Sequence, residues 1–153
     1  MTDITPIARA RQLCTFLLDG QLFGVDVREV QEVLRYHEMT RVPLAPPVVE
    51  GLINLRGQIV TAIDLRRRLE LPPRPAGRQP MNIVVRTDDG AVSLLVDAIG
   101  DVVEAEDAAF EQPPEALQGV ARTLIPGAYK LADRLLLLLD TRKAIDVGTT
   151  AAA

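Results

Sequence analysis

The sequence predicts a mainly β protein with a few short helices. Valine and isoleucine occur in short apolar runs, which favour strands over long helices. The dipeptides Asp19-Gly20 and Asp89-Gly90 each separate two such runs, an arrangement typical of tight β-hairpins. At 153 residues the chain is expected to form one domain, or two very small units that share a core.

Composition and charge argue against several classes of protein. The formal net charge is -4 and no basic face interleaved with aromatic residues is present, so a nucleic-acid partner is not expected. The single cysteine, Cys14, cannot form an internal disulfide, so nothing indicates an oxidising compartment. The longest purely apolar run, Leu135 to Leu139, is too short to cross a membrane, and residues 1–12 lack an apolar signal core. We expect a cytoplasmic protein without direct membrane insertion.

The first half of the chain is predicted to contain a hairpin, a helix and an extended segment after a disordered tail over residues 1–11. The helix is inferred from VREVQEVLR, where three valines and Leu34 fall on one helical stripe and charged residues, including Glu32, fall on the other face. The two hairpin strands, the amphipathic helix and the extended segment are expected over residues 13–18, 22–25, 27–35 and 40–44.

The most informative stretch is residues 51–69, GLINLRGQIVTAIDLRRRL. Two apolar strands are interrupted by Asn54, Arg56 and Gly57, and Asp64 stands where the N-cap of a short helix is expected. The interruption is explained either by a tight turn that leaves Arg56 in solvent or by a functional role for the arginine. Residues 70–80 then contain four prolines and are expected to be a connecting loop, the clearest internal boundary of the domain.

The second half of the chain is predicted to repeat the pattern of the first. Strands are expected over 82–87 and 92–96, and the extended structure continues to residue 106. After an acidic surface connection over 104–115, we expect a hairpin over 124–139, a short helix capped by Asp140 and a disordered tail over 147–153. The matching features are a strand that ends in Asp26 or Asp97 and a later strand capped by Asp64 or Asp140, at offsets of about 71 and about 76 residues. Either the chain contains two similar small β-barrels packed together, or two hairpin-rich halves resemble each other by chance.

No constellation of catalytic residues is present in the sequence. One histidine, His37, and one cysteine cannot form a Cys/His zinc site, and the only serine, Ser93, lies in a strand without a nucleophile elbow. No phosphate-binding glycine motif occurs. We therefore expect no enzymatic activity, no cofactor and no metal.

A binding role is better supported, because Glu32 and Arg56 can form a charge-assisted pair. An exposed pair of this kind contributes little to stability, so orienting a docking surface is the better explanation for it. Val30 belongs to the apolar stripe and is as readily explained by core packing.

The stretch GLINLRGQIVTAIDLRRRL resembles the signature of the CheW family of chemotaxis coupling proteins, with N-x-R-G, an apolar strand and D-L-R in order. Three flanking segments also resemble that family in the same order, FLLDGQLFGVDVREVQEVL, LLVDAIGDVVE and GAYKLADRLLLLLDTRKAI. The resemblance covers about residues 12–146. It implies two intertwined five-stranded SH3-like β-barrels in a single domain, and a non-enzymatic adaptor that couples chemoreceptors to the histidine kinase CheA at the inner face of the membrane.

Site residues follow from the same resemblance. It implies a surface that binds the cytoplasmic hairpin tip of a receptor, formed by Val30, Glu32, Asn54, Arg56, Gly57 and Ile83. Looser matches place Gly51 and Val102 near contacts with the regulatory domain of CheA. Where many relatives have proline and glycine, this chain has Thr61 and Ser93, which bear on local strand geometry.

Two other interpretations compete with chemotaxis coupling. The same fold could serve a non-flagellar system, such as pilus motility or second-messenger control. A small β-barrel that binds a metabolite is a different class, which the scarcity of aromatic residues and of convergent polar groups disfavours.

Overall fold

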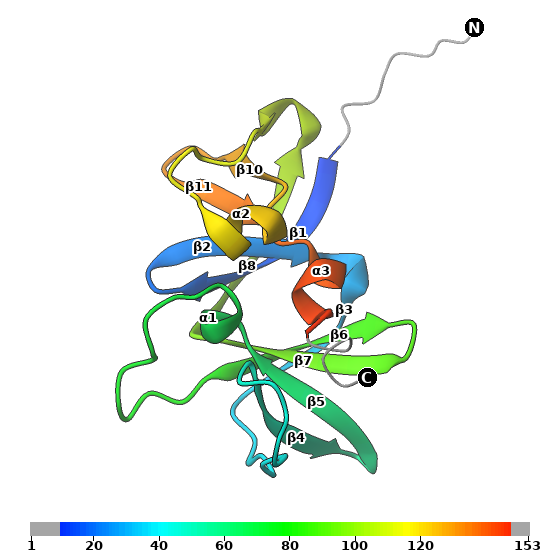
Figure 1. Ribbon diagram of the computed structural model, residues 1–153. Helices are drawn as coiled ribbons and strands as arrows, with labels where there is room; N and C mark the ends of the chain where they lie inside the picture. Colours follow the sequence, from blue (N-terminus) through cyan, green and yellow to red (C-terminus); the bar gives the residue numbers. More distant parts are fainter. Residues whose placement is uncertain (1–9, 148–153) are drawn as a thin grey trace, which may run out of the picture.

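The computed structural model describes residues 10–147, which form two β-sheets with short helices between and beside them (Figure 1). Its strands are β1 (Ala10–Leu18), β2 (Gln21–Asp26), β3 (Val30–Leu34), β4 (Val49–Leu55), β5 (Gln58–Asp64), β6 (Met81–Thr87), β7 (Gly90–Val96), β8 (Ala98–Glu106), β9 (Phe110–Glu111), β10 (Gly127–Lys130) and β11 (Leu135–Leu138). Its helical elements are η1 (Val27–Glu29), α1 (Leu65–Arg68), η2 (Asp107–Ala109), α2 (Gly119–Leu124) and α3 (Thr141–Ile145). The mainly β prediction is confirmed.

The two sheets exchange strands between the halves of the chain. The first sheet has the order β8-β1-β2-β11-β10-β9, and the second has the order β3-β6-β7-β5-β4. The β1–β2 hairpin thus pairs with strands from the second half, whereas β3 and β5 of the first half pair with the β6–β7 hairpin and β4 pairs with β5. This is the intertwined arrangement that the sequence resemblance implies, with the two-residue strand β9 as a sixth member of the first sheet.

The internal repeat is visible in the strand pairing. In each sheet a tight antiparallel hairpin is followed by a parallel neighbour, β11 beside β2 and β5 beside β7. Asp64, the last residue of β5, and Asp140, two residues after β11, each accept a backbone N–H of the helix that follows, from Arg66 and Lys143 respectively. Because order, direction and caps all agree, the two halves are structural repeats rather than chance look-alikes.

The predicted helix over residues 27–35 is wrong. Only Val27–Glu29 form a 3₁₀ turn, capped by Asp26, and Val30–Leu34 form strand β3 against β6. Val30, Glu32 and Leu34 are the half-buried residues of this strand, a period of two that the helical interpretation of the valines overlooked. Pairing with β6 supplies the backbone hydrogen bonds that decide between the two periods.

Four segments also differ from the sequence predictions. Ala10 and Arg11 belong to β1 instead of a tail, and Arg11 forms an ion pair with Asp26 at 3.2 Å. Val147 packs against the core, while the rest of both predicted tails, residues 1–9 and 148–153, lies outside the described residues. Within the predicted surface connection over 104–115, β8 continues to Glu106 and a short β9 follows. Thr40 makes a single bridge to Leu52 in place of a longer extended segment.

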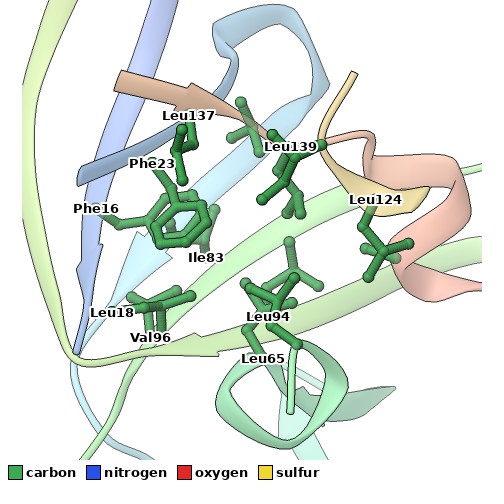
Figure 2. Close-up of a cluster of buried hydrophobic side chains, with 14 of the residues drawn as sticks. Phe16, Leu18, Phe23, Leu65, Ile83, Leu94, Val96, Leu124, Leu137 and Leu139 are labelled. Carbon is green, nitrogen blue, oxygen red and sulfur yellow. The ribbon is translucent and has the colours of Figure 1, made fainter. Parts of the chain in front are cut away.

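A single main core lies between the two sheets (Figure 2). Phe16 and Phe23 of the first sheet stack with ring centroids 5.7 Å apart, and Ile83 and Leu94 of the second sheet face the same cluster. Burial of these side chains holds the sheets together, since neither sheet alone covers its inner face.

The proline-rich segment 70–80 is tied to the body of the protein by Arg66. The Arg66 guanidinium donates to the carbonyls of Pro72 at 2.8 Å and Pro73 at 3.2 Å.

No helix in residues 10–147 is long and apolar enough to cross a membrane.

Candidate partner-binding site

The turn between β4 and β5 presents Arg56 to solvent. Leu55 and Gln58 pair across a two-residue loop, in which Arg56 has φ +52° and Gly57 has φ +88°. Positive φ at both positions characterises the type I′ turn, whose twist matches that of the strands it joins. The Asn54 side chain closes the turn by accepting the Gly57 N–H at 2.9 Å. The N-x-R-G motif therefore forms a tight turn, which is the first of the two explanations that the sequence offers.

Arg56 also forms an ion pair with Glu32 on β3. The Arg56 side chain is 70% exposed and the Glu32 side chain 20% exposed, so the pair sits at the surface with its carboxylate partly sheltered. The hydrogen bond from Arg56 lowers the pKa of the Glu32 carboxyl, and a second bond from the Gln31 amide acts in the same direction. Both charges are thus present at neutral pH on the same patch of surface.

Of the other residues predicted for this surface, some lie at the pair and others do not. Asn54 and Gly57 belong to the same turn as Arg56. Val30 is half-buried and packs against the main core. Ile83 is fully buried opposite Val33, so it supports β3 from within and cannot itself touch a partner.

Two exposed apolar side chains that the sequence reasoning missed are close to the pair in the sequence. Ile59 is 60% exposed directly after the Arg56 turn, and Val33 is 39% exposed on β3. An isoleucine in the first positions after a tight turn, where polar residues are usual, was the available signal for Ile59. Ile59 also lines a groove of about 790 Å³ between the second sheet and α3, together with Gln58, Thr61, Arg86, Thr141, Arg142 and Ile145.

Gly51 and Val102, the two residues predicted for kinase contacts, lie on different sheets. Gly51 is buried in β4, where a Cβ atom would meet the Thr40 carbonyl oxygen at 2.7 Å. A glycine is therefore required for the strand to approach the residue 39–40 segment. Val102 lies on β8 of the first sheet and is 55% exposed. The structure brings Glu32 and the turn residues Asn54, Arg56 and Gly57 together, but it separates Gly51 from Val102.

Potential reactive groups lie away from the pair. Cys14 is buried in β1, and burial raises the pKa of its thiol. Ser93 is fully buried and donates its hydroxyl to Asn82 Oδ1 at 2.7 Å. Residues 10–147 contain no group of three or more His, Cys, Asp or Glu side chains placed to hold a metal ion.

The protein is thus a small module of two interlocked β-sheets, which carries the exposed Glu32–Arg56 ion pair at the β4–β5 turn. The family model of the CheW-like domain matches residues 12–148. The chain belongs to this family.

Individual relatives agree with this assignment. The chain is 29% identical to the chemotaxis protein CheW of Bacillus subtilis over 147 aligned residues. The alignment covers 96% of this chain and 94% of the relative. It is 26% identical over 114 residues to the protein PilI of Pseudomonas aeruginosa, over 74% of this chain and 64% of the relative. The crystal structure of the scaffolding protein TtCheW from Thermoanaerobacter tengcongensis superimposes with a TM-score of 0.81 at 27% identity, over 91% of this chain and 94% of that chain.

Proposed function

We propose that this protein is a non-enzymatic chemotaxis adaptor that couples transmembrane chemoreceptors to the histidine kinase CheA. The observation that carries the proposal is the Glu32–Arg56 pair, which a β4–β5 turn and an edge strand hold together at the surface. In this role the protein works in the cytoplasm, at the inner face of the membrane. Membership of the CheW-like family and relatives named as chemotaxis proteins support the same function.

The receptor contact is proposed to centre on this pair. The helical hairpin tip of a receptor docks against exposed Ile59 and Val33, with the groove beside α3 adjoining Ile59, and meets the two charges at the edge of the apolar contact. An exposed ion pair contributes only about 0–1 kcal/mol to folding. Its value lies in fixing the orientation of the partner, because charges at the rim of an interface select register and orientation.

The kinase contact is proposed to lie elsewhere, on both sheets. Val102 offers an exposed apolar side chain on β8, and Gly51 underlies the residue 39–40 segment of the second sheet. Individually small contacts of this kind gain strength when many copies act together in an array.

A second candidate is the same coupling role in a non-flagellar system. The similarity to PilI of Pseudomonas aeruginosa supports it, since that relative is not named as a chemotaxis protein. The genes that neighbour the coding sequence separate the two candidates, because pilus genes favour the second and flagellar genes the first.

Co-sedimentation with receptor-containing membranes and a CheA-type kinase tests the proposal. Arg56→Ala is expected to weaken receptor binding by about tenfold or more, equivalent to ~1.4 kcal/mol. Arg122→Ala is the matched control, because Arg122 is also an exposed arginine but donates to the carbonyls of Pro114 and Leu117 away from the pair.

The outcomes discriminate clearly. Wild-type protein that joins the complex and raises kinase activity, combined with loss of receptor binding in folded Arg56→Ala, supports the adaptor role and its site. Wild-type protein that binds neither partner refutes the proposal, and a thermal-shift screen against metabolites then tests the small-molecule alternative.

A further inference from the structure

The edge strand β3 carries one extra residue immediately before Glu32. Val30 pairs with Val85 and Glu32 pairs with Val84, so two steps along β3 match one step along β6 and Gln31 has no opposite residue. A β-bulge of this kind re-aims the side chains that follow it and increases the local twist of the strand. The direction of the Glu32 carboxylate therefore depends on where the bulge sits.

Arg86 holds the strand on the N-terminal side of the bulge. This residue follows Val85 on β6, and its Nη1 atom donates to two backbone carbonyls of the partner segment, that of Arg28 at 3.0 Å and that of Val30 at 3.1 Å. A single guanidinium nitrogen thus links the middle residue of η1 to the last residue before the bulge. Such a charged donor forms stronger hydrogen bonds than a neutral one.

A second side chain of β6 holds the other end of the strand. Asn82 is fully buried and its Nδ2 atom donates to the Arg35 carbonyl at 2.9 Å, just beyond Leu34. Its own Oδ1 atom accepts the Ser93 hydroxyl at 2.7 Å, which orients the amide. Glu32 lies between these two attachments on a strand whose only neighbour in the sheet is β6.

We propose that Arg86 is a positioning residue for the Glu32–Arg56 pair, which it maintains by pinning the bulge of β3. Arg86 touches neither member of the pair through any described hydrogen bond, and it acts through the backbone of residues 28–30. The importance of this positioning for receptor docking rests on the proposed function, whereas the positioning itself is a property of the isolated protein.

The test measures the pKa of Glu32 by carboxyl NMR without any partner. Arg56→Gln gives the reference for a broken pair, in which the Glu32 pKa rises toward its ordinary value while Gln31 and His37 still face the carboxylate. Arg86→Ala is expected to raise the Glu32 pKa most of the way to that reference, and Arg86→Lys to raise it less because a lysine retains a charged donor. Arg122→Ala, which removes an exposed arginine bonded to two carbonyls elsewhere, is expected to leave it unchanged.

The readouts separate failure of this inference from failure of the proposed function. A Glu32 pKa that stays at the wild-type value in folded Arg86→Ala overturns the positioning role, and the milder Arg86→Lys decides the matter if the alanine variant does not fold. A raised pKa supports it. Receptor co-sedimentation of the same variants then tests the docking site. Retained receptor binding in a variant with a raised Glu32 pKa refutes the pair as the docking site, but it leaves the positioning role of Arg86 intact.

Discussion

Arg66 and Asp97 form a two-point ion pair that links the helix after β5 to the end of β7. The Arg66 Nε donates to Asp97 Oδ1 at 2.8 Å and its Nη2 donates to Asp97 Oδ2 at 2.6 Å. Asp97 also accepts the backbone N–H of Asp19, from the β1–β2 turn of the other sheet. This carboxylate therefore joins both sheets and, through Arg66, the proline-rich segment.

The stability of the fold is expected to fall in acid because of Asp97. Burial alone raises the pKa of this carboxyl, but the Arg66 hydrogen bonds, the Asp19 N–H and the nearby Arg74 outweigh burial and lower it. A carboxyl whose pKa is lower in the folded chain stabilises the fold fully above the unfolded value of about 3.9, and this contribution is lost as the pH falls through the folded value.

Urea unfolding between pH 7 and pH 3 measures this effect. Asp97→Asn is expected to cost up to ~3 kcal/mol at pH 7, because it leaves the buried Arg66 with only the more distant, half-exposed Asp19 as an ion-pair partner, and to flatten the acid dependence. The control Asp133→Asn changes an exposed aspartate and is expected to leave both stability and its pH dependence unchanged. An Asp97→Asn protein with the wild-type acid dependence contradicts the assignment.

Replacing Arg56 by asparagine is expected to separate folding from binding. Asparagine adopts positive φ more readily than arginine, and Asn-Gly is the preferred pair for a type I′ turn, so relief of strain offsets the loss of the Glu32 contact. We expect a free energy of unfolding between the wild-type value and ~1 kcal/mol above it. Receptor binding falls as in Arg56→Ala. A loss of stability greater than about 1 kcal/mol shows that the ion pair, not the turn, dominates at this position.

Asn54 is expected to act through the turn. Asn54→Ala removes the acceptor of the Gly57 N–H and should lower the free energy of unfolding by about 1 kcal/mol. Asn54→Asp keeps an acceptor oxygen in the same place and should restore most of the loss. If alanine and aspartate are equally destabilising in urea unfolding, the side-chain hydrogen bond is not the reason for asparagine at this position.

Gly51→Ala is expected to destabilise the second sheet. The new methyl group meets the Thr40 carbonyl oxygen at 2.7 Å and Met39 Cβ at 3.0 Å, so the segment bridged to Leu52 must move. Overpacking of this kind typically costs about 1–3 kcal/mol. Gly20→Ala is the control, because nothing lies within 4 Å of the added atom and only its φ of +79° opposes the change. Loss of the Thr40 amide protection in hydrogen exchange locates the damage, and unchanged protection in a destabilised variant contradicts this explanation.

Features set by neighbouring residues were predictable from the sequence. Both predicted hairpins form, the first with its turn at Asp19-Gly20 and the second with its turn at Asp88-Asp89, one residue earlier than the predicted Asp89-Gly90. Asp64 and Asp140 cap their helices as expected, because such features depend on a few consecutive residues. The choice between helix and strand at residues 27–35 was not predictable, because the valines fit a helical period and only the ladder with β6 favours a strand.

Parts of the site depend on contacts distant in the sequence. Glu32 and Arg56 were paired correctly because their charges are complementary, although Glu32 lies on a strand and not on a helix. The burial of Ile83 and the grip of Arg86 on residues 28–30 depend on the pairing of β3 with β6, which no local pattern encodes.

The exchange of strands between the two sheets also fixes the order in which the protein can be completed during synthesis. The second sheet has all five strands once residue 96 has left the ribosome, because β3 to β7 are consecutive in the chain. The β1–β2 hairpin, made first, waits for β8 and finally for β11 at residues 135–138 before its neighbours exist. This hairpin is therefore among the last elements to be fully paired, and both of its strand edges stay unpaired until the strands of the second half are made.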